Sequence, residues 1–356
     1  MISSSTPALR DLERPFFIVG TERSGSNLLR LVLDAHSRLS IPHPPHIMRF
    51  VHPLAPSYGD LADDRVFAEL AADVSRLVAW HTYPWPHAPG AAELVARSRG
   101  RTLFALYAAA CESHCVQAGK ARWGCKSTFM IHHGDVILRQ YPAARFLLLV
   151  RDPRDVAVSA RESVFNHFHP WFVARLWAHE QRKGRRLLET LAPSQTLRLH
   201  YEALLADPEG EVRRVCAFLD EPFEPSMLAF FERPEARRSA SLCHDWRNTD
   251  RGILRGNAGR FARALAPRDI AWVEAAAAAE MAWFGYEPVH PGPVPHPGLL
   301  EQLRFWVEEK RAKARVEWRS LRRDRNYPLR VRKDLLLLWL RLKSAWRNLR
   351  ARLSGR

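Results

Sequence analysis

A short loop near the start of the chain combines residue types that suit it to bind a phosphate. It follows an uninterrupted apolar run, Phe16–Gly20, which we expect to be a buried strand. The loop carries one cation, Arg23, followed by four small or polar residues: Ser24, Gly25, Ser26 and Asn27. Backbone N–H groups exposed by glycine, hydroxyl groups and a guanidinium are all donors to phosphate oxygens.

The spacing of Gly20 and Gly25 also occurs in Gly-x-x-x-x-Gly-Lys-[Ser/Thr] loops, which bind nucleoside triphosphates with Mg²⁺. In those loops the lysine contacts the terminal phosphates and the hydroxyl holds the metal. Here Ser26 and Asn27 stand at these two positions, and the cation, Arg23, lies inside the loop. We therefore expect a phosphate site that needs no metal. The alternative is a nucleotide-binding kinase or hydrolase, but the loss of the Lys-[Ser/Thr] pair disfavours it.

A second expected strand, Arg145–Val150, contains the apolar run Phe146–Val150 and leads into two cations, Arg151 and Arg154. Ligands of open parallel sheets bind where the strands end, so Arg151 should lie on the same edge as the first loop. Arg154 either joins it in binding an anion or pairs with a nearby carboxylate such as Asp152. Two anion-binding positions on one edge suit a ligand that is phosphorylated at two places.

The elements that must position these residues indicate an α/β fold, a parallel β-sheet flanked by helices. A third and weaker strand pattern, Thr196–His200, precedes Tyr201. Strands separated by helical segments are typical of this architecture. Helical patterns follow the strands or lie between them, at residues 28–35, 155–163, 209–219 and 267–281.

The basic charge of the chain is concentrated after its globular part. We predict an α/β domain over residues 1–290, a Pro/Gly-rich linker over 291–298 and a basic amphipathic helical tail over 299–356. Residues 301–356 hold 18 Lys and Arg against 6 Asp and Glu, a net +12 of the chain's +16. Helices are expected at 299–325 and 332–353. The tail could bind an anionic membrane surface, dock on protein including a second copy, or contact nucleic acid, which nothing but positive charge favours.

Together these residues resemble the sulfotransferase family, which uses 3′-phosphoadenosine 5′-phosphosulfate as sulfuryl donor. The resemblance covers about residues 14–286 and implies the P-loop NTPase-like sulfotransferase fold. It implies that the loop from Arg23 to Asn27 holds the 5′-phosphosulfate. Arg151 and Ser159 match an Arg and a Ser that bind the 3′-phosphate, and Tyr201 matches an aromatic residue near adenine.

A looser match lies in the Gly- and Arg-rich stretch 251–261, where the family often returns a basic segment over the cofactor. On this resemblance, Arg255 and Arg260 are expected to close over the 3′-phosphate.

The reaction that the resemblance implies needs a general base for the acceptor hydroxyl and positive charge for the moving group. Lys126 falls where the family often has a lysine near the sulfuryl group, and Arg23 should act with it. No acid follows the first helix, but His43 and His46 do, and histidine titrates near neutral pH. We favour His46, with His43 and the more distant pair His132 and His133 as alternatives; both nearer histidines could also be plain turn residues.

We therefore expect a sulfotransferase of the EC 2.8.2 type, which releases adenosine 3′,5′-bisphosphate and needs no metal. The acceptor would offer a hydroxyl, or less readily an amine, as in a carbohydrate, lipid or small metabolite. Five cysteines without a C-x-x-C pair, and the lack of an apolar signal core in residues 1–14, predict a cytoplasmic protein, soluble or at the inner membrane face. The alternative from another class is a non-catalytic membrane-associated adaptor that retains the fold.

Overall fold

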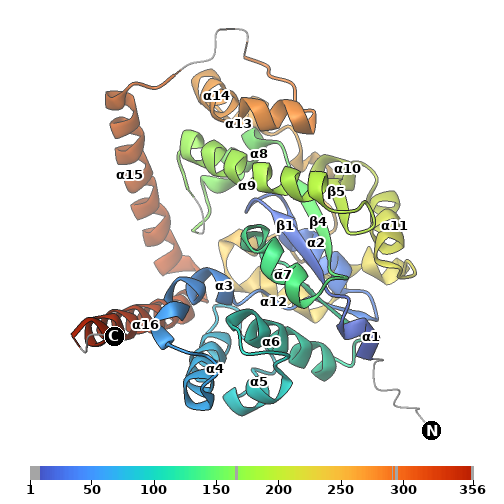
Figure 1. The fold of residues 1–356 in the computed structure, drawn as a ribbon. Coiled ribbons are helices and arrows are strands. Elements are labelled where there is room, and N and C mark those ends of the chain that lie inside the picture. Colours follow the sequence, from blue (N-terminus) through green and yellow to red (C-terminus); the bar gives the residue numbers. More distant parts are fainter. Residues whose placement is uncertain (1–8, 165–166, 291, 293–295, 354–356) are drawn as a thin grey trace. The chain divides into compact units, whose positions relative to one another are not determined.

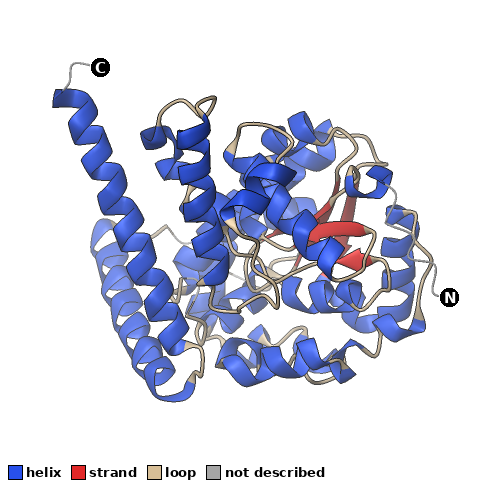
Figure 2. Cartoon of the chain, turned by 90° about the horizontal axis from the view of Figure 1, so that it is seen from below, coloured by secondary structure: helices blue, strands red, loops and turns tan. Residues whose placement is uncertain are grey.

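The computed structural model describes residues 9–164, 167–290, 292 and 296–353. Five parallel strands form one sheet in the order β2-β3-β1-β4-β5, with helices around it (Figures 1 and 2). The predicted α/β class is confirmed. Of the predicted 291–298 linker, residues 291 and 293–295 lie outside the described part. No helix in the described ranges is long and apolar enough to cross a membrane.

The chain divides into two compact units. The first comprises Met1–Phe17, His36–Ala144 and Asn326–Arg356. Its elements are α1 (Leu9–Leu12), β2 (Leu39–Ser40), α3 (Ile47–Phe50), α4 (Asp64–Ala79), α5 (Ala91–Arg97), α6 (Leu103–Gln117), β3 (Arg122–Cys125), α7 (Gly134–Gln140) and α16 (Tyr327–Leu353), with 3₁₀ helices η1 (His52–Tyr58) and η2 (Thr128–His132).

The second unit comprises Ile18–Ala35 and Arg145–Arg325. Its helices are α2 (Ser26–Asp34), α8 (Pro153–Ala160), α9 (Pro170–Thr190), α10 (Tyr201–Ala206), α11 (Pro208–Leu219), α12 (Pro234–Leu242), α13 (Phe261–Ala264), α14 (Pro267–Phe284) and α15 (Leu299–Arg323), and its strands are β4 (Arg145–Val150) and β5 (Thr196–His200). Four 3₁₀ helices complete it: η3 (Pro225–Met227), η4 (Phe230–Glu232), η5 (His244–Trp246) and η6 (Arg255–Asn257).

Strand β1 (Phe16–Gly20) contributes to both units. In the first unit Phe16 and Phe17 pair with β3, opposite Gly124 and Cys125. Every residue of β1 is buried, as expected for a strand covered on both faces. In the second unit β4 and β5 pair in parallel from Phe146–Thr196 to Val150–His200. This register ends both strands at the same edge, where Arg151 and Tyr201 follow.

Helices α9 and α14 of the second unit pack together, with Trp177 against Phe284 at 6.2 Å between ring centroids. The C-terminal end of α14 is closed by Gly285 in the left-handed conformation, which glycine adopts without strain. The chain's five cysteines are buried thiols.

Candidate functional site

The loop between β1 and α2 is a tight turn in which glycine is required twice. Gly20 and Gly25 have φ values of 139° and 90°. A Cβ on Gly20 would lie 2.3 Å from the carbonyl oxygen of Leu149, and one on Gly25 would lie 2.3 Å from the ring of Tyr201. Arg23 also has positive φ, 71°, which is uncommon outside glycine and costs free energy. The loop is thus held in a strained shape by β4 and α10.

The loop and the first turn of α2 present unsatisfied donors. Within the described chain, Ser24 Oγ and Asn27 Nδ2 are buried and have no hydrogen-bond partner. The N-cap residue Gly25 provides no capping side chain, and the first turn of α2 has no acid. Buried donors left unpaired cost free energy, and the N-terminus of a helix favours an anion. These donors fit a phosphate group.

Arg151 joins the loop to two other segments. Its Nη1 donates to the carbonyl of Arg23 at 3.1 Å, and its Nη2 donates to the carbonyl of Asn257 at 2.8 Å. The guanidinium lies over the ring of Tyr201, 4.4 Å from its centroid. Its Nε is buried and has no partner among the described residues, so this arginine keeps one donor for a ligand. Arg151 lies beside the loop, as two strands ending at one edge require.

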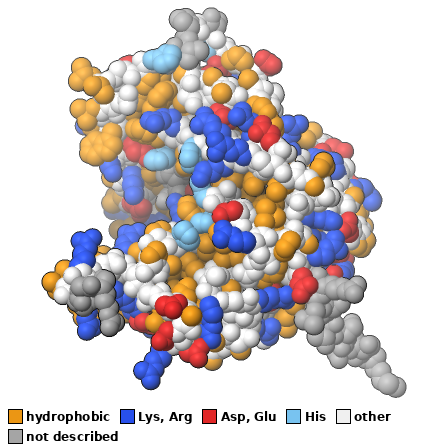
Figure 3. Space-filling model, viewed as in Figure 1, with side chains coloured by type: hydrophobic (Ala, Val, Ile, Leu, Met, Phe, Trp, Pro, Cys, Tyr) orange, Lys and Arg blue, Asp and Glu red, His pale blue; other side chains and the backbone are white. Residues whose placement is uncertain are grey.

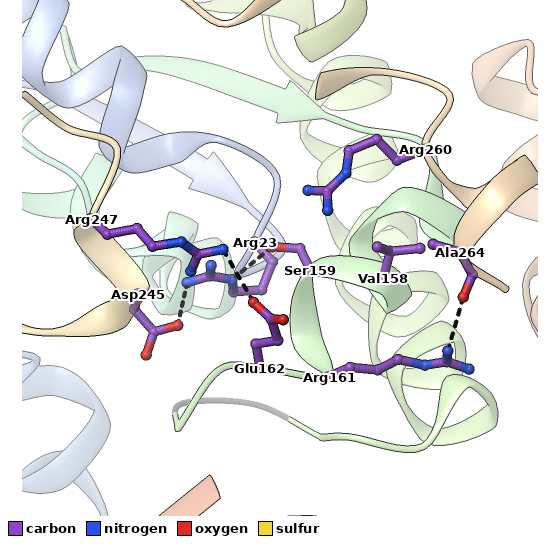
Figure 4. A pocket seen from close by; sticks show the side chains of 9 residues that line it. All are labelled: Arg23, Val158, Ser159, Arg161, Glu162, Asp245, Arg247, Arg260 and Ala264. Atoms are coloured by element: carbon purple, nitrogen blue, oxygen red, sulfur yellow. Dashed lines mark hydrogen bonds and ion pairs between the residues drawn. The ribbon is translucent and has the colours of Figure 1, made fainter. Parts of the chain in front are cut away.

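A small pocket, wholly within the second unit, contains the side chain of Arg23. Its Nε donates to Ser159 Oγ at 3.1 Å, and its Nη1 pairs with Asp245 Oδ1 at 3.0 Å (Figure 4). The pocket has a volume of about 210 Å³, below the roughly 300–1,000 Å³ of pockets that enclose a whole small molecule. It can therefore take one anionic group of a ligand. Its lining comprises Arg23, Val158, Ser159, Arg161, Glu162, Asp245, Arg247, Arg260 and Ala264.

Cations outnumber acids in this lining, and both acids are paired. Glu162 accepts from His244 at 3.2 Å and from Arg247 at 3.1 Å. The hydrogen bond from His244 and the charge of Arg247 hold the pKa of Glu162 below its ordinary value. Asp245 pairs with Arg23. An arriving anion would compete with these carboxylates for the guanidinium groups.

The basic segment after η6 is tied to this site by a buried carboxylate. Asp155 accepts from the backbone N–H groups of Gly259 at 2.7 Å and Phe261 at 2.8 Å. The tie brings Arg260 to the pocket, where its Nη1 donates to Asn257 Oδ1 at 3.0 Å. Arg255 is exposed, and no hydrogen bond or ion pair joins it to the site residues that the structure describes. Of the two arginines expected here, the structure brings one into the pocket.

Arg154 has a structural role. It is buried and pairs with Asp152 at 2.7 Å and with Glu274 at 2.7 Å. Although burial opposes it, the hydrogen bonds to these carboxylates raise the pKa of Arg154. The structure thus supports the carboxylate-pairing interpretation of Arg154, which does not line the pocket that contains Arg23, Ser159 and Arg260.

The catalytic candidates His46 and Lys126 lie in the first unit. His46 has φ 53°, and its Nδ1 lies 3.2 Å from Ser127 Oγ. Burial lowers the pKa of His46 well below 6.5, and the positive charge of the half-buried Lys126 lowers it further. The imidazole is thus neutral near pH 7 and can accept a proton. The alternative, His43, is buried and stacks on Tyr83 at 5.1 Å.

Sequence reasoning missed Asp245 and Arg247 in the pocket lining, together with Asn257. Asn257 supports two site residues, since its carbonyl accepts from Arg151 and its Nδ2 donates to the Tyr201 hydroxyl at 2.8 Å. Its position inside the Gly- and Arg-rich stretch 251–261 was a usable signal. Nothing in the sequence around residues 245–247 indicates a pocket.

The sheet and its phosphate-type loop define an α/β fold of the sulfotransferase type. Residues 15–225, more than half of the chain, match the model of the sulfotransferase family, and the chain belongs to that family. It is 25% identical over 317 residues to Protein-tyrosine sulfotransferase 1 of Danio rerio, covering 84% of this chain and 81% of that one. A protein from Aquifex aeolicus is 24% identical over 263 residues, 70% of this chain.

Among solved structures, the fold is similar to the sulfotransferase domain of the Synechococcus PCC 7002 olefin synthase. The TM-score is 0.54 at 19% identity, with 77% of this chain and 95% of that domain covered. The chain spans about a third of the length of two curated relatives that it matches: the match covers 31% of the Aquifex protein and 37% of a second relative.

Gly25→Ala should weaken binding of adenosine 3′,5′-bisphosphate about ten- to hundredfold, for two reasons. The new methyl group would clash with the ring of Tyr201, and alanine is strained at the positive φ of this position. Isothermal titration calorimetry measures the change. Gly256→Ala is the matched control, since a Cβ there meets nothing within 4 Å. Equal affinities of the two variants would show that the loop's shape does not determine binding.

Asp245→Asn should tighten binding of the same bisphosphate about fivefold, because Arg23 then loses its competing carboxylate. The gain should shrink at high ionic strength, where charge interactions are screened. Asp250→Asn removes an exposed acid five residues away and serves as the control. Weaker binding by the Asp245 variant would mean that this carboxylate orients Arg23 for the ligand.

Proposed function

We propose that this chain transfers a sulfuryl group from 3′-phosphoadenosine 5′-phosphosulfate to a hydroxyl, less readily an amine, of an acceptor. The observation that carries the proposal is the hydrogen bond from Arg151 to the Arg23 carbonyl. This hydrogen bond ties the loop, with its unsatisfied donors, to Arg151, and the pocket that holds the Arg23 side chain adds a second group of cationic and polar side chains. A donor with phosphate groups at both its 3′ and 5′ positions is the ligand class that uses both.

The residues divide between the two ends of this donor. Backbone and side chains of Ser24, Gly25, Ser26 and Asn27 would hold the 5′ side at the N-terminus of α2. The 3′-phosphate would bind Arg151, Ser159 and Arg260, with Tyr201 beside the base. Arg23 donates to Ser159 and pairs with Asp245 in this structure, and we assign its guanidinium to the oxygens of the moving group.

In the reaction, the acceptor oxygen forms a bond to sulfur while the bond from sulfur to the 5′-phosphate oxygen breaks. The acceptor proton passes to the neutral imidazole of His46, and adenosine 3′,5′-bisphosphate leaves. Lys126 and Arg23 stabilise the charge that develops on the oxygens around sulfur. Burial lowers the pKa of His46, so the imidazole is neutral at neutral pH and its nitrogen is free to take a proton, while the same shift makes it a weaker base than a solvent-exposed histidine.

Calorimetry with adenosine 3′,5′-bisphosphate and, separately, with ATP and Mg²⁺ tests the ligand class. We expect the protein to bind the bisphosphate tightly and ATP with Mg²⁺ weakly or not at all. The opposite result would replace the proposal with a kinase or hydrolase. Transfer from the labelled donor is then assayed against carbohydrates, lipids, small alcohols and tyrosine peptides, the last because of the name of the Danio rerio relative. Bisphosphate binding without transfer to any of them would favour the adaptor alternative.

We further propose a cytoplasmic location. Five buried thiols support it, because a reducing compartment keeps such cysteines from forming disulfides. Fractionation of cells that express a tagged chain tests the location, and recovery from an oxidising compartment would contradict it.

A further inference from the structure

Helix α16 has two apolar faces on opposite sides. One face packs on the first unit and buries Leu336, Leu337 and Leu340. At its edge, the ammonium group of Lys343 pairs with Asp73 at 2.7 Å and with Glu69 at 2.8 Å. Leucine packing and charge pairing thus hold this side of α16 against the rest of the first unit.

The other face, the outward stripe, is exposed from Leu335 to Leu353. Its spacings of three and four residues keep its members in one line on a helix of 3.6 residues per turn. At 100° per residue, this line lies about opposite the buried leucines. More than half of each side chain is open to solvent. The outward stripe comprises Leu335, Leu338, Leu342, Trp346, Leu349 and Leu353.

Cations border the outward stripe on both sides. Arg341 and Arg352 lie along one border, and Arg350 lies along the other, with its guanidinium 4.5 Å from the ring centroid of Trp346. Asp334 is the one acid within the helix bounds. Figure 3 shows apolar and basic side chains together where α16 is seen in Figure 1. The exposed side of this helix combines apolar bulk, an indole and positive charge.

We infer that α16 binds an anionic lipid surface, with the outward stripe inserted at the level of the headgroups. Leucines bury apolar area there, tryptophan suits the interface, and flanking arginines contact anionic headgroups. The opposite face stays packed on the first unit, so the protein would bind as a folded unit without releasing the helix.

The same features disfavour the other occupants. A second copy packed stripe to stripe would bring arginine borders together, and like charges beside an apolar helix seam destabilise it. A surface that binds nucleic acid presents cations to the phosphates across its contact area, whereas the middle of the outward stripe consists of leucine and tryptophan. An anionic bilayer satisfies both the apolar centre and the basic borders.

Sedimentation of the full chain with vesicles tests the inference. We expect binding to vesicles that contain phosphatidylglycerol and at least tenfold weaker binding to pure phosphatidylcholine. About 0.5 M salt should reduce the binding, because it screens the arginines. Equal binding to both vesicle types, or no binding to either, would overturn the inference.

Three variants locate the contact. Leu342→Glu should lower the vesicle partition coefficient more than tenfold, because it places a charge in the centre of the stripe. Asn348→Glu adds the same charge to an exposed position outside the stripe and should have a smaller effect, about that of one charge. Arg352→Gln should lower the coefficient about fivefold. Circular dichroism checks that each variant is folded.

Light scattering distinguishes self-association. A dimer that Leu342→Glu converts to monomer, without vesicle binding by either form, would assign the stripe to a second copy and overturn the lipid proposal. A monomer that binds anionic vesicles, and loses this binding on the same substitution, supports it. Bisphosphate affinity should be unchanged in all three variants, so the outcome is independent of the donor site.

Discussion

Arg151→Ala should weaken binding of adenosine 3′,5′-bisphosphate at least tenfold, and it has the largest effect on affinity that we expect. A charge-assisted hydrogen bond contributes roughly 1.5–3 kcal/mol, or about ten- to 150-fold in affinity. The substitution would also remove the donor to the carbonyls of Arg23 and Asn257. The ligand would lose both a contact and the support of the loop that holds its other end. Calorimetry of the folded variant gives the affinity directly.

Two further variants separate charge from geometry at this position. Arg151→Lys keeps the charge but cannot donate to two carbonyls and a ligand at once, so it should recover little of the affinity. Arg139→Ala removes an arginine that is 76% exposed on α7 and leaves the bisphosphate affinity unchanged. Wild-type affinity in a folded Arg151→Ala protein would remove this residue from the site.

Much of the sheet could be predicted from the sequence because its central strands are covered on both faces. The bounds of β1, β4 and β5 coincide with the predicted ones. The continuous apolar runs of β1 and β4 explain this for the two central strands, whereas β5 is a partly exposed edge strand with a weaker pattern. Strand β3 was missed because Arg122–Cys125 gives no apolar run; its Arg122 is buried and donates to the carbonyl of Arg14. Strand β2 has two residues, too few for a pattern.

The candidate site was predictable where local chain geometry alone determines it. The loop at Arg23 and the position of Arg151 follow from two strands that end at one edge. Asn257 and Asp245 depend on contacts across 106 and more than 200 residues of chain, for which no spacing rule exists. Likewise, Glu274, 120 residues from Arg154, decides that this arginine is structural.

The last helix of the chain begins earlier than its sequence pattern predicts. The sequence predicts a second tail helix from residue 332, because Pro328 should interrupt it. The observed helix α16 begins at Tyr327 and holds Pro328 in its first turn, where a missing N–H costs nothing. The prediction of a separate tail over 299–356 remains a prediction, although α15 and α16 belong to different units.

His46→Ala should lower the turnover number by about 10²–10⁴-fold and leave bisphosphate affinity within about twofold, as expected for loss of a general base. The imidazole is neutral at pH 7, because burial and the charge of Lys126 lower its pKa well below 6.5. A base acts when deprotonated, so the acid limb of the turnover profile should lie well below pH 6.5 and be absent from the variant. His87→Ala, on a half-buried histidine that pairs with Glu93, is the control.

A loss of turnover at low pH could also come from unfolding of the protein. The direction of the histidine pKa shifts shows at which pH the protein becomes less stable. Burial lowers the pKa of His81 to about 4, also below its value in the unfolded chain. The unfolded chain therefore binds more protons below about pH 6.5, and stability falls as pH falls. Turnover is interpretable where circular dichroism shows the native fold. Within that range, an acid limb at or above pH 6.5, or full activity of His46→Ala, would transfer the base role to His43, His132 or His133.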